Sequence, residues 1–441
     1  MLKTAKSRKI TTKKTSRADI ENFYKGNQEE LIGLEYERLS LDGKTLKNAS
    51  YEKLEKIIKQ FCAISFWDLI YDENTVIGAI SKNGTSISLE PGCQLEISIS
   101  PKKEILAIDI ELKKIIETLD KIADIYDVIF VGYGITPSAN VDEIQLLQKR
   151  RYEVMNKYLP IQKFGELSQK MMRQTAGIQI NIDYKDSNDA FYKLKFFNLI
   201  MPFMMGLCAN SSLEKNKLYS KKSLRARVWN YTGKERCNLF YKNIFKGLKN
   251  NVFKNYIQEI LNVPMIFIER DGKIIEINGK IRFSEFLKTG FRGYFATIED
   301  YILHQSLCFP DIRLKKYIEI RNHDSSNPEM ALALATFYKG LAYFDVKKLL
   351  SKFKYLKIKN VEKYNEKIID FGLDYQINNK ISGWDVVAKL FIISSSNLTT
   401  NERIYLEPIL KILKQRKTMS DLVQDKKIKS AKELIEFINK Y

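Results

Sequence analysis

Apolar and polar residues alternate in several stretches of the first half of the chain, and this pattern predicts β-strands. Residues 31–41 read LIGLEYERLSL, and residues 66–98 hold further alternating runs separated by short polar turns. One of these turns contains Asn83-Gly84, a strong hairpin signal between two such runs. Apolar residues recur at helical spacing over residues 51–62, 103–126 and 188–208. We therefore expect antiparallel strands with helices packed against them.

The pattern continues with further strands and then changes to helix. It predicts strands at 127–135, at the end of 166–186 and at 313–321, a hairpin at 264–276, helices at 142–158 and 298–309, and a basic loop at 212–236. From Pro328 onward almost every stretch has helical spacing. This order predicts the α+β class, with a largely antiparallel, curved sheet flanked by helices and a helical C-terminal region.

Two pairs of glutamates lie on the predicted strands. Glu35 and Glu37 are two residues apart in GLEYERL, and Glu90 and Glu96 bracket a Pro-Gly turn in ISLEPGCQLEISIS. Because successive strand residues point to opposite faces, carboxylates of the same parity share a face. The first pair alone would also suit an exposed strand edge. The second pair lies among apolar and small residues, where a charge is costly unless it is paired or binds a metal. Surface decoration and a metal site both remain open.

Glu319 and Arg321 form a further charged pair on a predicted strand, in YIEIRNHD. The pair fits a salt bridge, or a metal ligand beside a guanidinium that binds phosphate. Carboxylates on one sheet would suit Mg²⁺ or Mn²⁺, which prefer oxygen ligands. Such ions bridge ATP phosphates and offset the charge of phosphoryl transfer. The sequence thus raises the hypothesis of ATP chemistry on a carboxylate-lined sheet.

Composition and charge restrict the classes of partner. The 441 residues include 73 Lys+Arg and 53 Asp+Glu, a net charge of +20 that suggests a nucleic acid or another anion. The excess is mostly lysine spread along the chain, as on a solvated surface, and acidic clusters repel phosphate unless a metal intervenes. We therefore expect no specific nucleic-acid partner.

The five cysteines are scattered singly, as in a reducing compartment. With no visible secretory signal or membrane-spanning run, a cytoplasmic location is expected.

Six motifs follow one another along the chain: GLEYERL, ISLEPGCQLEISIS, MMRQTAGIQINIDY, SLRARVW, VPMIFIERDG and FPDIRLKKYIEIRNHD. In these motifs and their order, from about residue 16 to 345, the chain resembles the plant-type glutamate–cysteine ligases, a family shared by plants and many proteobacteria. The resemblance implies a glutamine-synthetase-like catalytic domain over residues 16–345. A disordered basic tail (residues 1–15) would precede it, and a helical C-terminal region (residues 346–441) would pack on it.

The resemblance also implies an activity. ATP would drive the joining of the γ-carboxyl of L-glutamate to the amine of L-cysteine through γ-glutamyl phosphate, the first step of glutathione synthesis. Two or three Mg²⁺ ions would assist, and the protein would be a monomer or homodimer. Matching motif positions imply metal ligands at Glu35, Glu37, Glu90, Glu96, Gln179 and Glu319. They also imply that Arg321 contacts the ATP phosphates and acts with Glu319 in catalysis. Arg173 and Arg225 would hold substrate carboxylates, and Trp229 would line the pocket.

The chain departs from the family pattern at three places. The family usually shows PGGQ, ANSP and RGAD. Here Cys93 replaces the second Gly of the first motif, two serines follow Asn210 in the second, and Asn322-His323 replaces Gly-Ala in the third. Several of these changes flank the expected substrate pocket. The alternative is therefore a ligase of the same fold that joins glutamate, or a similar acid, to a different amine.

Overall fold

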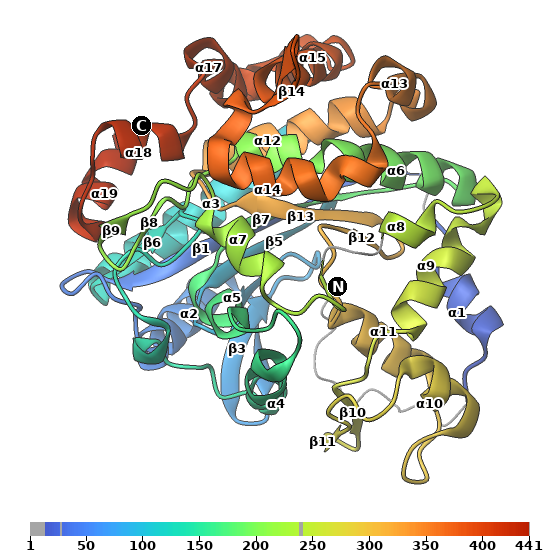
Figure 1. Cartoon of the computed structure of the whole chain (residues 1–441). Helices are drawn as coiled ribbons and strands as arrows, with labels where there is room; N and C mark the ends of the chain where they lie inside the picture. Colours follow the sequence, from blue (N-terminus) through green and yellow to red (C-terminus); the bar gives the residue numbers. More distant parts are fainter. Residues whose placement is uncertain (1–13, 27–28, 238–240, 441) are drawn as a thin grey trace.

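A nine-stranded sheet forms the centre of the computed structural model, which describes residues 14–26, 29–237 and 241–440 (Figure 1). Its strands follow the order β12-β13-β7-β1-β5-β4-β3-β2, and β6 also pairs with β1. All of these pairings are antiparallel. The strands are β1 (Ile32–Asp42), β2 (Asp68–Asp72), β3 (Thr75–Ile80), β4 (Ser86–Leu89), β5 (Leu95–Lys102), β6 (Val128–Val131), β7 (Gly177–Ile182), β12 (Ile312–Leu314) and β13 (Ile318–Asp324). The predicted α+β class with a largely antiparallel sheet is confirmed.

The central strands alternate between two chemically different faces. Ile178, Ile180 and Ile182 of β7 are fully buried, and so are Ile318 and Ile320 of β13. These side chains pack under the helices α6 (Ser187–Leu207) and α12 (Pro328–Ala342), which Figure 1 shows above the sheet. Helices α2 (Tyr51–Ser65) and α3 (Ile105–Ile125) extend this cover toward β3 and β5. The apolar parity of each strand therefore faces helices, and the polar parity faces the other way.

Shorter elements surround this core. The helices before α12 are α1 (Arg17–Phe23), α4 (Arg150–Tyr158), α5 (Ser168–Gln174), α7 (Leu224–Asn230), α8 (Tyr241–Ile244), α9 (Val252–Leu261), α10 (Phe283–Thr289) and α11 (Ile298–Ser306). Three small hairpins are formed by β8 (Leu213–Glu214) with β9 (Lys217–Leu218), β10 (Phe267–Arg270) with β11 (Lys273–Glu276), and β14 (Gln376–Asn378) with β15 (Ile381–Ser382). In the described part of the chain, no helix is both long and apolar enough to cross a membrane.

Three predicted elements differ in the structure. The helix expected over 142–158 begins only at Arg150. A single 3-10 turn covers Val141–Glu143, residues 144–149 are not helical, and the Leu147 N–H donates to the Pro91 carbonyl at 2.8 Å. The loop expected over 212–236 contains helix α7, whose first turn is capped by the Ser223 side chain. The single strand expected over 313–321 is two strands joined by a turn, in which the Lys315 N–H donates to the Tyr317 carbonyl.

Most of the tail that was predicted to be disordered lies outside the described residues. Residues 1–13 are not among the described residues, whereas Thr15 is buried and donates its N–H to the Ala296 carbonyl at 2.9 Å. The capping box predicted for the next helix is present, because Ser16 and Asp19 exchange hydrogen bonds at the start of α1. The hydrogen bond from Thr15 to Ala296 explains why the chain has a defined position at Thr15.

The C-terminal region is helical and packs on the upper helices of Figure 1. Its helices are α13 (Val346–Lys352), α14 (Val361–Phe371), α15 (Gly383–Ser396), α16 (Thr400–Arg403), α17 (Glu407–Gln415), α18 (Met419–Asp425) and α19 (Ala431–Ile438). Helix α18 reaches past them to the loop before α7. The Ser420 N–H donates to the Ala209 carbonyl at 3.0 Å, and the Ser420 hydroxyl donates to the Lys222 carbonyl at 2.6 Å. This helix therefore fixes the segment that leads into α7.

Candidate active site

The face of the sheet turned away from α6 and α12 carries a row of polar side chains brought together by strand register. Glu37 of β1 lies opposite Glu96 of β5, and Glu35 of β1 lies opposite Gln179 of β7. On the next pair of strands, Asn181 of β7 lies opposite Glu319. Directly opposed like charges destabilise a sheet unless a cation or proton offsets them. The facing glutamates of β1 and β5 therefore mark this face as a site rather than a packing surface.

This arrangement raises the pKa values of the Glu37 and Glu96 carboxyl groups. Burial, together with the nearby charge of Glu90, raises the pKa of Glu37 to about 7. Burial also raises the pKa of Glu96 well above its usual range, and Glu35, Glu90 and Glu37 add to that rise. Four glutamates thus influence one another across β1, β5 and the turn after β4. The cluster needs positive charge in order to be fully ionised.

Amide side chains connect this acidic cluster to its surroundings. The Gln179 amide donates to Glu37 Oε1 at 2.9 Å, and the Gly177 N–H donates to Glu37 Oε2 at 2.5 Å. The Asn181 amide donates to Glu35 Oε1 at 2.8 Å. Gln179 also accepts a hydrogen bond from Arg321 Nη1 at 2.5 Å. Gln179 is therefore the link between the glutamates and the arginine.

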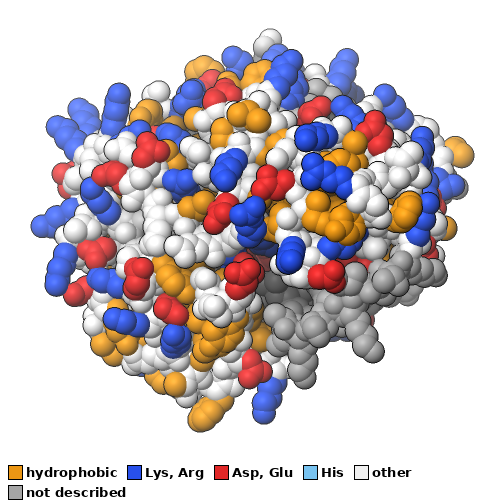
Figure 2. Space-filling model, turned by 90° about the horizontal axis from the view of Figure 1, so that it is seen from below, with side chains coloured by type: hydrophobic (Ala, Val, Ile, Leu, Met, Phe, Trp, Pro, Cys, Tyr) orange, Lys and Arg blue, Asp and Glu red, His pale blue; other side chains and the backbone are white. Residues whose placement is uncertain are grey.

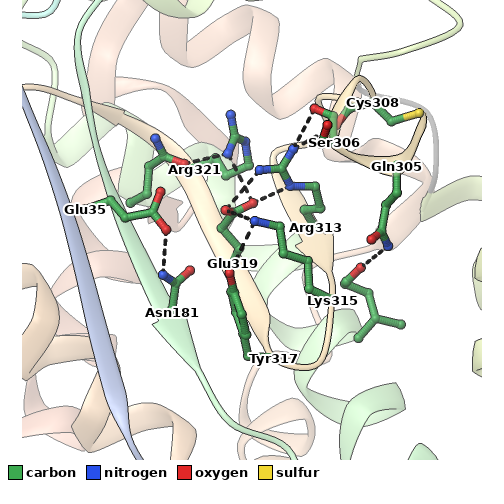
Figure 3. Close-up of polar contacts among 12 residues, drawn as sticks. Glu35, Asn181, Gln305, Ser306, Cys308, Arg313, Lys315, Tyr317, Glu319 and Arg321 are labelled. Carbon is green, nitrogen blue, oxygen red and sulfur yellow. Dashed lines mark hydrogen bonds and ion pairs between the residues drawn. The ribbon is translucent and has the colours of Figure 1, made fainter. Parts of the chain in front are cut away.

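Three cations surround the fully buried Glu319 carboxylate (Figure 3). Arg313 forms a two-pronged contact with it, Lys315 Nζ lies 2.8 Å from Oε1, and Arg321 Nη1 lies 3.1 Å from Oε2. Although burial alone would raise the pKa of Glu319, these three positive charges hold it well below its usual range. The donor set around Glu319 therefore does not suit a metal cation, and its contacts give it the task of orienting Arg321.

Arg225 of α7 brings a second guanidinium to the edge of this face. It is only 3% exposed, and Nη2 donates to the Arg321 carbonyl at 3.2 Å. Its Nε and Nη1 atoms are buried without an acceptor. One turn later on the same helix, Trp229 has its ring centroid 5.8 Å from the Arg225 guanidinium carbon, and its buried indole N–H also lacks an acceptor. Buried donors without acceptors are costly, which marks a place where a ligand would supply acceptors.

Arg173 does not join these residues. Its guanidinium donates to the carbonyls of Val141 and Ile144 and to Asn156 Oδ1 at 2.9 Å. None of these partners belongs to the acidic cluster. The contacts show that Arg173 ties helix α5 to the segment before α4. Its Nε atom is buried without an acceptor, and its role in holding a substrate carboxylate stays a prediction.

Glu90 is presented by a tight turn between β4 and β5. The Cys93 N–H donates to the Glu90 carbonyl at 2.8 Å, and the Gly92 N–H donates to the Gln94 side chain at 2.9 Å. Cys93 has a φ of +65°, a left-handed conformation that glycine adopts more readily. This accounts for the glycine that the family usually has there. The Cys93 side chain is buried, and burial raises the pKa of its thiol to about 12, so it is no nucleophile at neutral pH.

Replacing Gly92 by alanine is expected to destabilise the protein by about 1–3 kcal/mol, a typical cost of overpacking. A Cβ at this position would lie 2.2 Å from the Arg173 backbone carbonyl, which cannot yield as a side chain can. Urea unfolding measures the effect. The control is Gly43→Ala, where the nearest atom would be 3.4 Å away, and which should unfold like the wild type. Equal stability of both variants would contradict the close approach.

Some site residues were missed on the sequence alone. Asn181 follows Gln179 by two residues in GIQINIDY, so strand parity could have identified it. Lys315 lies in a turn, where parity does not apply. Asp324 is buried and accepts hydrogen bonds from the hydroxyls of Ser211 at 2.6 Å and Ser223 at 2.9 Å. These contacts fix the start of α7 against β13, and their sequence separation of over 100 residues gave no local signal.

The predicted metal ligands can be tested against this geometry. Within the described ranges, no three His, Cys, Asp or Glu side chains converge closely enough to hold a metal ion. The chemistry of Glu35, Glu37, Glu90 and Glu96 nevertheless suits a hard cation, since all four supply carboxylate oxygens, and the pKa values of Glu37 and Glu96 are raised by burial and by neighbouring glutamates. The metal assignment of these four residues and Gln179 stays a prediction.

The sheet carries carboxylates and buried guanidinium groups on one face, a combination that suits a protein of the class that binds an anionic ligand together with cations. Comparison with known proteins gives the family. The sequence profile of glutamate–cysteine ligase family 2 matches residues 31–380. The chain belongs to this family.

Relatives and a solved structure agree with this membership. The chain is 30% identical over 315 residues to glutamate–cysteine ligase B, chloroplastic, of Oryza sativa subsp. japonica, covering 71% of this chain and 62% of that protein. It is 29% identical over 317 residues to the chloroplastic glutamate–cysteine ligase of Arabidopsis thaliana, covering 71% and 59%. The matches thus span about three fifths of these relatives. The glutamate–cysteine ligase of Francisella tularensis in complex with AMP shares the fold, with a TM-score of 0.56, 13% identity, and 93% and 88% of the two chains covered.

Proposed function

We propose that the protein is an ATP-dependent glutamate–cysteine ligase. One observation carries the proposal: the acidic cluster and the Arg321–Arg225 pair share one face of the sheet and are joined through Gln179. A carboxylate–amine ligase needs a cation site beside anion-binding groups, because it brings a nucleotide triphosphate next to a carboxylate substrate. The family and its curated relatives supply the identity of the substrates.

The chemistry requires no protein nucleophile. The γ-carboxylate of glutamate attacks the terminal phosphorus of ATP, ADP leaves, and an acyl phosphate forms. The amine of cysteine then attacks the acyl carbon, and phosphate leaves with its bonding electrons. Arg321, held by Glu319 and Gln179, offsets negative charge on the phosphoryl group. Arg225 and Trp229 offer buried N–H donors to a substrate carboxylate. The protein therefore contributes mainly positioning and charge.

Magnesium is part of the proposal. Glu35, Glu37, Glu90 and Glu96, with Gln179, would hold it, and Glu319 would not because its charge is already balanced by three cations. When bound, Mg²⁺ would neutralise nucleotide phosphates and the acidic cluster together. Cytoplasmic location, a monomer or homodimer, and a domain boundary near residue 345 stay predictions.

Surface charge does not favour a nucleic-acid function. On the face drawn in Figure 2, the described Lys and Arg side chains are interspersed with Asp and Glu and do not form a single stripe. A nucleic-acid interface concentrates basic residues on one face. The net charge of +20 is therefore better explained by a solvated surface.

Phosphate release from ATP tests the function. With Mg²⁺ and L-glutamate present, we expect turnover that depends on L-cysteine and stops when Mg²⁺ is chelated. Omitting glutamate is the control. Turnover that responds to another amine and not to cysteine would support the alternative ligase. No glutamate-dependent turnover with any amine would exclude both.

A further inference from the structure

A small cavity lies beside the site, between helix α7, the segment that leads into β12, and strand β13. Its volume is about 10 Å³, enough for one water-sized group. The wall is formed by Trp229, Phe309, Pro310, Asp311, Arg321 and Asn322. It adjoins the guanidinium proposed to face the phosphoryl group, because Arg321 is both part of the wall and bonded to Gln179. The cavity can therefore receive a single polar group close to the reacting atoms.

Asp311 is the only acidic side chain in that wall. It is partly buried, and among the described residues no Lys or Arg forms an ion pair with it, since Arg321 pairs with Glu319 instead. A hydrogen bond from the Asn322 side chain is its contact on the cavity side. Burial raises the pKa of Asp311 to about 6, although Arg225 and Arg321 pull it down. Asp311 is thus a carboxylate with a higher than usual affinity for a proton, and its negative charge can attract an ammonium group.

Helix α7, which also lines the cavity, presents hydrogen-bond donors that could bind a carboxylate. Three buried N–H groups have no acceptor: Nε and Nη1 of Arg225 and the indole N–H of Trp229. Trp229 also lines the cavity and packs on Phe309, with ring centroids 5.7 Å apart. A carboxylate bound at these donors and an amino group bound at Asp311 would both be satisfied. An α-amino acid carries this combination of charges.

We propose that Asp311 binds the amino group of the acceptor amino acid and accepts the proton that this group must lose before it attacks. The inference rests on the proposed function and adds a catalytic residue to it. No other carboxylate that lines the cavity is available for the task. Glu319 cannot serve, because it is paired with three cations.

The proton and electron balance is simple. The acceptor arrives as an ammonium ion, since an amino group is largely protonated at neutral pH. One N–H proton passes to the Asp311 carboxylate, which leaves a lone pair on nitrogen. That lone pair forms the bond to the acyl carbon while the carbon–oxygen bond to phosphate breaks. A second proton leaves the nitrogen with the departing phosphate, and the product is a neutral amide.

The test compares two acceptors in Asp311→Asn. Cysteine must lose a proton before it reacts, whereas hydroxylamine is already unprotonated at neutral pH and traps the acyl phosphate as a hydroxamate. We expect kcat with cysteine to fall by about 100-fold or more, within the range of general-base catalysis. Hydroxamate formation from glutamate, ATP and Mg²⁺ should stay within a few-fold of wild type. Asp311→Glu, which keeps the carboxylate, should recover part of the cysteine reaction.

Each outcome decides between the two proposals. If both acceptors lose activity equally in Asp311→Asn while Asp311→Glu is no better, Asp311 does not act on the acceptor and the inference is wrong. If wild type forms no hydroxamate and releases no phosphate, the proposed function itself fails. Should Asp311→Asn not fold, the ratio of the two acceptor rates in Asp311→Glu against wild type replaces it, and an unchanged ratio overturns the inference. Asp370→Asn, which loses only a surface pair with Lys221, is the control and should match wild type.

Discussion

Glu96→Gln is expected to fold as well as the wild type and to lose at least about 100-fold in Mg²⁺-dependent turnover. Changing a residue that only supports a metal ligand costs up to about 100-fold, and loss of a ligand should cost at least as much. The two effects separate because the Glu96 carboxyl is hard to ionise in the folded protein, where burial and three neighbouring glutamates raise its pKa. A neutral amide of the same shape therefore costs little stability. The same amide removes the charge that would hold a cation.

Glu96→Gln is checked by urea unfolding and by phosphate release across a Mg²⁺ titration. Glu117→Gln, on the exposed side of helix α3, is the matched control and should change neither result. Wild-type turnover and Mg²⁺ dependence in Glu96→Gln would remove Glu96 from the site. A large loss of stability would instead mean that the carboxylate supports the fold.

Arg313→Leu is expected to destabilise the protein by about 3–5 kcal/mol, the cost of breaking a buried ion pair by removing one partner. Arg313 is 6% exposed, and Glu319 beside it is fully buried. The Arg313 guanidinium also donates to the carbonyls of Ser306 and Cys308, so these two carbonyls lose a donor together with one of the three cations around Glu319. Urea unfolding measures the change.

The comparison for Arg313→Leu is Lys44→Met, which breaks an exposed pair with Asp127 and should cost less than about 1 kcal/mol. A similarly small effect in Arg313→Leu would show that Lys315 and Arg321 suffice to neutralise Glu319. In that case the carboxylate would retain charge balance without its two-pronged partner.

Strand parity explains why much of the site could be predicted. The apolar and polar positions alternate strictly in GIQINIDY and from Leu34 to Glu37 in GLEYERL, so Glu35, Glu37 and Gln179 share a face once the strands pair. The family resemblance then supplied the order of the strands' motifs. What parity cannot give is the set of neighbours contributed by turns and distant elements. Lys315 reaches Glu319 from a turn, and Arg173 binds loop carbonyls instead of the sheet.

Secondary structure was mispredicted where tertiary contacts override local pattern. Residues 144–149 have apolar spacing compatible with a helix, yet the turn after β4 captures the Leu147 N–H and keeps them extended. Helix α7 was overlooked because its basic residues suggested a loop, although Ser223 gives it a sequence-level cap. In the first case the deciding hydrogen bond joins two segments that are far apart in the sequence. In the second case it is a serine cap, which is a weak signal when read from the sequence alone.

The contacts of helix α18 set a limit on how far this protein can be shortened at its C-terminal end. The family profile ends at residue 380, but Ser420 bonds to the backbone on both sides of the loop that leads to Arg225. A fragment cut at the profile boundary would leave that loop without its outer brace. A segment outside the family profile thus helps to position Arg225, one of the buried guanidinium groups of the site.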